Sequence, residues 1–344
     1  MISSTVPKNL CNRIQLRKNG ELKLYYGKIK GLDRKVSRIM VGTAAEPFLS
    51  GGDACQILDD AFSLGINTID TARNYGLAER SVGDWMEKRG NRDDVVILSK
   101  CAHPDDYSPR RVSEKDIRED FNVSSGYLRT DHIDIYLLHR DDPSVPAGKV
   151  IEIMNALHEE GKIGIFGASN WSVERILEAN TYAEEHGLIP FTVSSPNYCL
   201  AHQVTDMWGG GVTITGPENK DIRDWYASEG MPIVAHSPLA RGFLTGRVKS
   251  GDRQSASVLD SFAEAGFLCD ENIERLRRCE LMAEIKNCTV AQLSLAWIFS
   301  SPMEVYTAIS SSSKARMEQN VSALDIILTS QERDYLDLVT DVIP

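Results

Sequence analysis

Long hydrophobic segments are missing from this chain of 344 residues. Its unbroken apolar runs are short, as in Ile135–Leu138, whereas a membrane-spanning helix needs about 20 consecutive apolar residues. Met1–Leu10 is mostly polar and contains no apolar stretch that could form the core of a signal peptide. We therefore expect a soluble, cytoplasmic protein that enters no membrane.

Positive charge is scarce. The chain has 38 Lys and Arg residues against 49 Asp and Glu residues, which gives a net charge of −11. Proteins that bind a nucleic-acid backbone need clustered positive charge, so we expect no nucleic-acid partner. The overall shortage of positive charge still allows a local basic pocket for one phosphorylated ligand.

Cysteines at metal-binding spacing are also missing. The seven cysteines are widely spread and form no Cys-x-x-Cys pair, so the sequence predicts neither a zinc site nor a disulfide framework. We interpret them as reduced thiols that pack as small hydrophobic residues. His103, Asp105 and Glu114 also lack the spacing of metal ligands, and we expect no metal.

What is present is a regular alternation of short β-rich runs with longer segments of helical period. The runs are rich in Ile, Val and Leu, as is typical of parallel strands that helices cover on both faces. The expected strands are Arg38–Val41, Ile66–Ile69, Val95–Ser99, Ile133–Leu138, Ile163–Gly167, Thr192–Ser194, Pro232–Ala235 and Val305–Ile309. The expected helices are Asp53–Leu64, Leu77–Lys88, Glu114–Leu128, Lys149–Glu160, Val173–Glu185, Lys220–Ser228, Glu271–Lys286, Val290–Phe299 and Gln319–Asp325.

Eight strands, each followed by a helix, predict an α/β protein with the (β/α)₈ TIM-barrel fold. The competing doubly wound sheet usually has a Gly-rich turn after its first strand, and here only Gly42 and Thr43 follow, without G-x-G-x-x-G. We expect residues 36–344 to form one barrel domain. Residues 1–35 are an N-terminal extension that we expect to form a β-hairpin across the barrel floor. The long connections 44–52, 199–219 and 241–270 should lie on the catalytic face.

Polar side chains stand at the ends of three consecutive strands. Asp70, Lys100 and His139 each close a strand, and Tyr75 follows Asp70 on a short loop. The carboxyl ends of barrel strands form the active site, and neighbouring strands are about 4.8 Å apart, so these side chains should converge. An ammonium lowers the pKa of a neighbouring phenol, and a histidine can polarise a carbonyl oxygen. The set suits protonation of an oxygen while a hydride reaches the attached carbon.

At these positions the sequence resembles the aldo-keto reductase superfamily. The resemblance runs from about Lys35 to Asp325. The segments that carry it are Ile69–Gly76, Leu98–Lys100, Asp131–His139, Glu160–Ile163, Gly167–Trp171 and Ser237–Gly246. The resemblance implies that Asp70, Tyr75, Lys100 and His139 form a catalytic tetrad.

The resemblance also implies a nicotinamide cofactor across the barrel top, bound without a Gly-rich phosphate loop. Ser169 and Asn170 match residues that contact the carboxamide, and Arg316 falls where an arginine often pairs with the 2′-phosphate, which favours NADP over NAD. The alternative role of Arg316 is an exposed helix charge. The implied cofactor-binding residues are Gly42, Thr43, Ser169, Asn170, Ser195, His236, Ser237, Leu239, Arg241, Gly242, Ser311, Ser312, Arg316 and Asn320.

Three positions depart from the family pattern. Ser195 stands where many relatives have a glutamine for the carboxamide, His236 stands where many stack a tyrosine or tryptophan on the nicotinamide, and Ser310 replaces a usual glycine. These changes indicate a divergent subgroup with an intact tetrad.

The leading hypothesis is an NADP-dependent carbonyl reductase or alcohol dehydrogenase that acts on an aldehyde, a ketone or a sugar. The second is a nicotinamide-binding regulatory subunit of slow turnover, since the superfamily includes channel-associated members. The third is a barrel lyase that uses Lys100 as a Schiff base, which the neighbouring Asp70 and Tyr75 disfavour.

Overall fold

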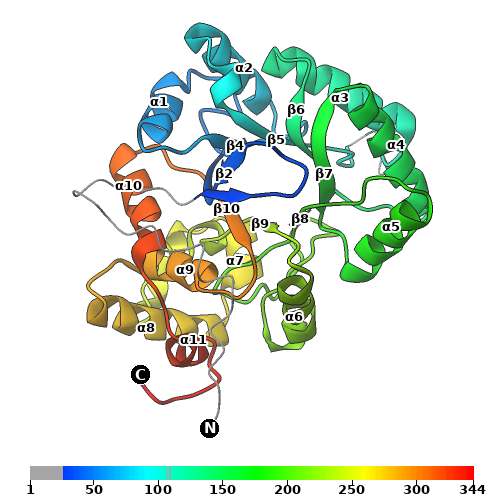
Figure 1. Ribbon diagram of the computed structural model, residues 1–344. Coiled ribbons are helices and arrows are strands. Elements are labelled where there is room, and N and C mark those ends of the chain that lie inside the picture. Colours follow the sequence, from blue (N-terminus) through cyan, green and yellow to red (C-terminus); the bar gives the residue numbers. More distant parts are fainter. Residues whose placement is uncertain (1–25, 106, 108–109) are drawn as a thin grey trace.

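Eight parallel strands close into a barrel in the computed structural model, which describes residues 26–105, 107 and 110–344 (Figure 1). The order around the barrel is β10-β3-β4-β5-β6-β7-β8-β9, and β10 closes the barrel by pairing with β3, Thr307 opposite Ile39. The strands are β3 (Ile39–Gly42), β4 (Thr68–Asp70), β5 (Val96–Cys101), β6 (Ile133–Leu138), β7 (Ile163–Ser169), β8 (Ser194–Ser195), β9 (Ile233–Ala235) and β10 (Val305–Ile309). The predicted (β/α)₈ fold is confirmed.

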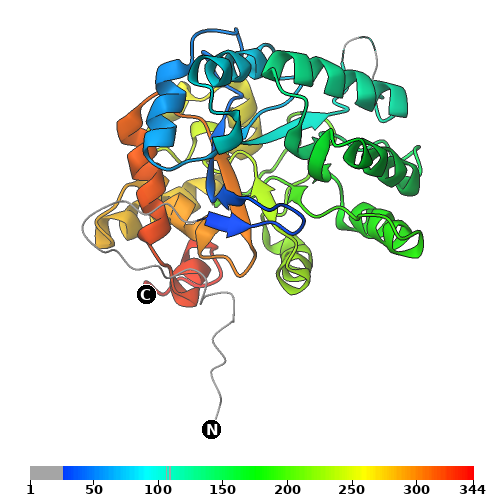
Figure 2. The same cartoon turned by 45° about the horizontal axis from the view of Figure 1, so that its top comes forward.

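Helices ring the strands (Figure 2). None of the described helices is long and apolar enough to cross a membrane. They are α1 (Cys55–Ser63), α2 (Ala78–Arg89), α3 (Glu114–Leu128), α4 (Ala147–Glu159), α5 (Val173–Glu185), α6 (Lys220–Glu229), α7 (Ser261–Phe267), α8 (Asp270–Ile285), α9 (Val290–Phe299), α10 (Lys314–Ser322) and α11 (Ser330–Leu336).

The predicted helix Gln319–Asp325 was wrong in its bounds, because α10 already begins at Lys314 and only a short 3₁₀ turn follows it. The helices α7 and α11 were not predicted. The seven residues of α7 make about two turns, which is too short for a clear apolar period. The start of α11 did carry a signal, the capping box of Thr329 and Glu332.

A two-stranded antiparallel hairpin crosses the amino-terminal end of the barrel, formed by β1 (Tyr26–Lys28) and β2 (Lys35–Ser37). Its Ile29 and Val36 are buried against side chains of the barrel interior such as Met40. Residues 1–25 of the predicted extension lie outside the described residues, and the domain boundary at residue 35 stays a prediction.

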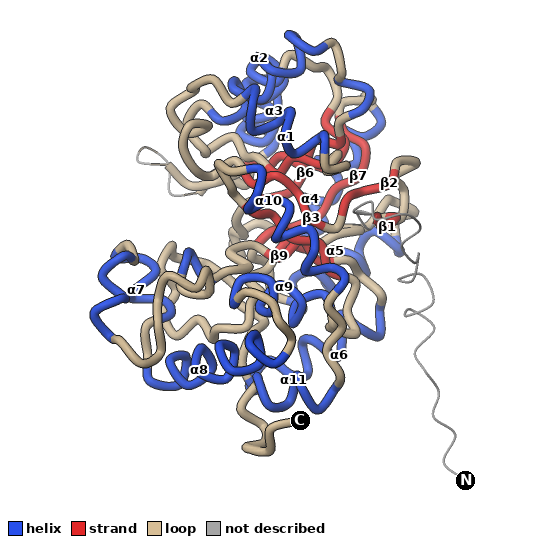
Figure 3. Tube along the Cα trace, turned by 90° about the vertical axis from the view of Figure 1, so that its left-hand side faces the viewer, coloured by secondary structure: helices blue, strands red, loops and turns tan. Residues whose placement is uncertain are grey.

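The strands are buried on both faces, which explains their unbroken apolar composition. Along β6, Ile135 and Leu137 belong to the cluster inside the barrel, while Tyr136 and Leu138 pack outward in the cluster between strands and helices. Each such fully buried side chain contributes roughly 1.5–3 kcal/mol. In side view, α7 and the hairpin lie on opposite ends of the barrel (Figure 3), so the connection 241–270 lies at the carboxyl ends of the strands, as predicted.

Candidate active site

An ion pair lies at the centre of the carboxyl end of the barrel. Lys100 Nζ on β5 donates to Asp70 Oδ1 at the end of β4 (2.6 Å) and to the Thr71 carbonyl (3.0 Å). The two side chains are 3% and 9% exposed. Thr43 contributes from the neighbouring strand, because its hydroxyl donates to the Asp70 carbonyl at 3.0 Å. The parallel ladder thus holds the carboxylate and the ammonium together.

The loop after β4 brings Tyr75 over this pair. It continues the ladder with β5, since Thr71 N donates to Leu98 O (2.8 Å) and Arg73 N donates to Lys100 O (3.0 Å). Lys100 Nζ lies 5.0 Å from the centroid of the Tyr75 ring. Gly76 has a φ of +55°, and a Cβ there would lie 2.5 Å from the Leu49 carbonyl oxygen, so the turn beside Tyr75 requires glycine.

His139 completes the group of four predicted catalytic residues. It follows β6, and its ring meets the Tyr75 ring edge-on at 5.6 Å and the His103 ring at 4.8 Å between centroids. The side chain is almost fully buried. The structure thus brings Asp70, Tyr75, Lys100 and His139 together, while their catalytic roles remain a prediction.

Burial and neighbouring charges set the protonation of this group. Burial raises the pKa of Tyr75 above its ordinary value, although Lys100 opposes this shift. The ammonium alone would lower this pKa, as the sequence predicts, but in the structure burial outweighs its effect. Burial alone would lower the pKa of Lys100, but Asp70 and Tyr75 raise it overall. At neutral pH the phenol is therefore protonated and the ammonium is charged.

His139 is neutral at neutral pH. Burial holds its pKa well below the usual value, and the positive charge of Lys100 lowers it further. Its Nδ1 is buried and has no hydrogen-bond partner within the described part of the chain. A neutral imidazole can donate one N–H to a carbonyl oxygen without competing as an acid with the tyrosine.

A cavity of about 610 Å³ opens above the tetrad. Most of the predicted site residues line it. They are Gly42, Asp70, Tyr75, Lys100, His139, Ser169, Asn170, Ser195, His236, Ser237, Leu239, Arg241 and Gly242. The remaining ones are not among the residues that line it: Thr43, Ser311, Ser312, Arg316 and Asn320.

The predicted carboxamide contacts form an internal network at the end of β7. Asn170 has a left-handed backbone (φ 59°), and its amide donates to Ser169 Oγ (2.9 Å) and to the His139 carbonyl (3.3 Å). Its Oδ1 accepts from Val212 N (3.1 Å) and lies 3.2 Å from His236 Nε2. A bound carboxamide would therefore have to share or replace one of these bonds.

Ser195 and His236, two of the departures, continue this wall of the cavity. Ser195 Oγ donates to the Val234 carbonyl at 2.8 Å. The His236 ring lies edge-on to Trp208, with centroids 5.9 Å apart. Burial, with Arg140 and Lys100, lowers the pKa of His236 to about 3, so the ring presents a neutral face to the cavity.

The segment after β9 has the features expected of an anion-binding wall. Ser237, Ala240 and Arg241 are all left-handed non-glycine residues, and such strained conformations cluster at ligand sites. Gly242 also has a positive φ of +104°, and a Cβ there would lie 2.8 Å from Arg247 Nη2. The missing side chain thus lets a guanidinium lie in the cavity wall, where it suits a pyrophosphate.

The predicted adenosine segment lies at the start of α10. Arg316 donates to Ser312 Oγ at 3.0 Å and is exposed. Ser310, the third departure, donates to the Gly42 carbonyl at 2.8 Å and so ties β10 to β3. Arg316 is not among the residues that line the cavity.

Sequence reasoning missed several polar residues of the cavity wall, among them His103, Arg140 and Arg247. Arg140 directly follows the catalytic candidate His139 at a strand end, and this position was the signal that could have found it. Arg247 lies in a long connection, where no pattern indicates which side chains point inward. Trp208, from the long connection 199–219, also lines the cavity.

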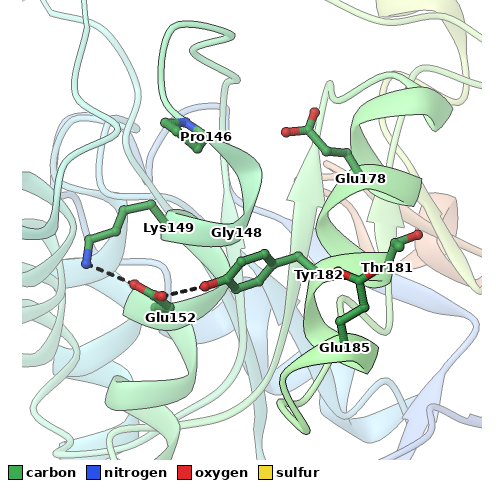
Figure 4. A pocket seen from close by; sticks show the side chains of 8 residues that line it. All are labelled: Pro146, Gly148, Lys149, Glu152, Glu178, Thr181, Tyr182 and Glu185. Carbon is green, nitrogen blue, oxygen red and sulfur yellow. Dashed lines mark hydrogen bonds and ion pairs between the residues drawn. The ribbon is translucent and has the colours of Figure 1, made fainter.

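A second hollow, of about 560 Å³, lies between the outer helices α4 and α5 (Figure 4). Its Glu152 accepts from Lys149 Nζ (2.9 Å) and from the Tyr182 hydroxyl (2.6 Å). The Tyr182 ring packs where Gly148 has no side chain. These groups satisfy one another, so the hollow between α4 and α5 is not the candidate active site.

Comparison with known proteins agrees with this geometry. A model of the Aldo/keto reductase family matches residues 38–341. The chain is 29% identical over 300 residues to a Schizosaccharomyces pombe protein named for the beta subunit of voltage-gated potassium channels, which covers 83% of this chain and 84% of that protein. It is 27% identical over 289 residues to an aldo-keto reductase of Strobilurus tenacellus, with 82% and 80% covered. It is 26% identical over 295 residues to norsolorinic acid reductase of Aspergillus flavus, with 82% and 70% covered.

Proposed function

The chain belongs to the Aldo/keto reductase family, and we propose that it is an NADP-dependent oxidoreductase that transfers a hydride between the nicotinamide and a carbonyl or alcohol. The substrate would be an aldehyde, a ketone or a sugar. One observation carries the proposal: Tyr75, Lys100, Asp70 and His139 meet at the floor of the cavity. The relatives named as reductases support it.

Each residue of the tetrad has a defined task in this reaction. Tyr75 donates its phenolic proton to the carbonyl oxygen as the hydride reaches the carbon. Lys100, held charged by Asp70, stabilises the phenolate that remains. Neutral His139 donates an N–H to the same oxygen and polarises the carbonyl. Because the site is buried, these interactions act in a medium of low polarity, where they are stronger than in water.

The cavity walls fit a nicotinamide dinucleotide. When bound, NADPH supplies the hydride. Ser169, Asn170 and Ser195 would hold the carboxamide, and Arg247 with the segment Ser237–Gly242 would hold the pyrophosphate. Arg316 and Ser312 would take the 2′-phosphate at the start of α10, where a guanidinium suits a phosphate through paired hydrogen bonds. The proposed contact of Arg316 and Ser312 with the 2′-phosphate is the reason why we propose NADP rather than NAD.

The test is a fluorescence titration of the full chain with NADPH and NADH, followed by a screen of aldehydes, ketones and sugars. We expect tighter binding of NADPH and consumption of NADPH with at least one carbonyl compound. Equal affinity would contradict the role of Arg316, and binding of neither would contradict the proposed function. Fractionation of the source cells would test the cytoplasmic location that the sequence predicts.

A nicotinamide-binding regulatory subunit is the second candidate function. The similarity to a protein named for a channel beta subunit favours it. The two candidate functions differ in the rate at which bound NADPH is oxidised. A reductase oxidises its bound NADPH within seconds when a good carbonyl is added, whereas a regulatory subunit would bind NADPH tightly and turn over slowly with every compound. Stopped-flow measurement of NADPH fluorescence distinguishes them.

The lyase alternative is disfavoured by the state of Lys100. A Schiff-base lysine must lose its proton to act as a nucleophile. Here Asp70 and Tyr75 raise the pKa of Lys100, and the ammonium is bound to Asp70 at 2.6 Å.

A further inference from the structure

Arg140 is a buried cation in the wall of the candidate active site. It follows His139 at the end of β6, lines the cavity and is only 8% exposed. Its one hydrogen bond within the described residues runs from Nη1 to the neighbouring His139 carbonyl, at 3.2 Å. Across residues 26–105, 107 and 110–344 no carboxylate lies within ion-pair distance of it. Its guanidinium therefore keeps most of its donors for a ligand.

An unpaired buried charge is unusual because it loses its hydration without compensation. The acid that acts on Arg140 electrostatically is Asp206. The Asp206 carboxylate already accepts from the backbone of Trp208 (3.2 Å) and Gly211 (3.1 Å), which holds it within its own loop. The positive charge of Arg140 is also felt in the site, since it lowers the pKa of His139 and His236. Arg140 thus adds a positive charge to the cavity wall, which a bound anion would compensate.

Arg140 follows a different strand from those that precede the proposed phosphate contacts. In the barrel order β10-β3-β4-β5-β6-β7-β8-β9, the strand β6 stands opposite β10. Arg316 and Ser312 follow β10, and Arg247 follows β9, whereas Arg140 lies beside the tetrad. An anion at Arg140 would therefore belong to the substrate rather than to the dinucleotide.

The loop 206–211 bounds the part of the cavity that lies beside Arg140. A Cβ on Gly210 would lie 3.8 Å from Arg140 Cδ, so the loop passes directly over the arginine side chain. Trp208 of this loop faces His236 and lines the cavity. Beside this loop the cavity is lined by the Arg140 cation and the Trp208 ring, with Arg241 5.6 Å from the centroid of that ring. This combination suits a short molecule with an anionic end.

We propose that Arg140 forms an anion subsite, and that the carbonyl substrate carries a carboxylate or a phosphate group a few atoms from its carbonyl carbon. This inference rests on the proposed function and names its substrate class. The planar guanidinium binds either group through paired, charge-assisted hydrogen bonds. The anion is held by Arg140 while the carbonyl oxygen lies at Tyr75 and His139, so the subsite orients the substrate for reduction.

Matched substrate pairs test the subsite. The full chain is assayed with 5-oxopentanoate against pentanal, and with glyceraldehyde 3-phosphate against glyceraldehyde, at saturating NADPH. We expect kcat/KM to favour the anionic member of at least one pair by about 10- to 100-fold, as charge-assisted hydrogen bonds in a buried site would give. The pair with the larger ratio identifies carboxylate or phosphate as the natural group.

Variants of Arg140 connect the preference to this residue. Arg140→Gln should bring the ratio close to one, mainly through a higher KM for the anionic compound, with a smaller change for the neutral one. Arg140→Lys keeps the charge without the planar fork and should retain part of the preference. Arg253→Gln is the matched control, because Arg253 is 75% exposed and pairs with Asp270 on the surface. It should keep the wild-type ratio, and circular dichroism checks that each variant is folded.

The outcomes separate this inference from the proposed function. If the wild type reduces both members of each pair with a ratio of kcat/KM values near one, the proposed anion subsite is wrong and the proposed reductase activity stands. If no carbonyl compound is reduced, the proposed function fails, and calorimetric titration with succinate and with inorganic phosphate decides on the subsite alone. Binding to the wild type that Arg140→Gln abolishes supports the subsite, and equal or absent binding overturns it.

Discussion

Tyr75 is the residue on which the proposed chemistry depends most directly. Tyr75→Phe keeps the ring that meets His139 edge-on and removes only the hydroxyl. We expect kcat to fall by about 100- to 10,000-fold, the usual contribution of a positioned general acid. The dissociation constant for NADPH should change less than about twofold, because no cofactor contact is proposed for this hydroxyl. Steady-state kinetics with fluorescence titration checks both, and a joint loss of turnover and binding would indicate a structural role instead.

The pH dependence of the reaction follows from the same residues. Reduction needs Tyr75 protonated and His139 neutral. Burial raises the pKa of Tyr75 and holds that of His139 well below its usual value, so neither group titrates between about pH 6.5 and 9. We expect kcat/KM for carbonyl reduction to be flat across this range. Oxidation of the alcohol needs the phenolate and should rise with pH. A reduction profile with an inflection near pH 6.5 would show that a histidine is the proton donor.

At the scale of elements, α2 and β5 are joined through a buried carboxyl group. Ser99 Oγ of β5 donates to Glu79 Oε1 of α2 at 2.5 Å, and Glu79 is 2% exposed. Burial raises the pKa of Glu79 above its ordinary value. A raised pKa in the folded state means that the protonated form is favoured there, so this contribution to stability is complete below about pH 4 and is lost as the pH rises through the folded-state pKa.

Glu79→Gln removes this pH-dependent cost while keeping a hydrogen-bonding side chain of the same size. We expect the variant to melt about 2 °C or more above the wild type at pH 8, and the difference to shrink at pH 5. Glu87→Gln, on an exposed position of the same helix, should show no such trend. Thermal unfolding followed by circular dichroism at both pH values measures this. A variant that is less stable at pH 8 would mean that the carboxylate is needed there.

Three helices that the sequence predicted with exact bounds have a capping side chain at their start. The bounds of α3, α5 and α9 agree with the prediction, and Ser113, Ser172 and Thr289 cap them through side-chain hydrogen bonds. In contrast, α10 follows a run of serines and has no side-chain cap, and its start was placed too late. A cap alone is not sufficient, because Asp260 and Thr329 also cap α7 and α11, which were not predicted. The inward direction of Arg140 depends on how β6 meets the loop 206–211, which no local pattern contains.

At the scale of the whole molecule, the barrel brings distant segments to one mouth. The tetrad comes from β4, β5 and β6, while the proposed cofactor contacts come from β7, β8, β9 and β10. The motifs predicted this convergence because the (β/α)₈ fold places all strand ends on one face. They did not predict the anion subsite proposed at Arg140, since that depends on which loop side chains turn inward. A cofactor bound across the mouth would link both halves of the barrel, and it should therefore stabilise the fold as one unit.

The preference for NADPH over NADH can be measured through the thermal stability of the whole fold. A ligand that binds only the folded state at 100 times its dissociation constant stabilises it by about 2.7 kcal/mol. We expect NADPH to raise the melting temperature by several degrees, and NADH at the same concentration to raise it less. Arg316→Ala should remove the difference by weakening NADPH alone, because Arg316 and Ser312 are held together at the start of α10. Arg253→Ala, which removes an exposed arginine that pairs with Asp270 and does not line the cavity, should leave the difference intact. If Arg316→Ala keeps the full preference for NADPH, the 2′-phosphate is bound by another cation of the cavity wall, and Arg247 is the next residue to replace.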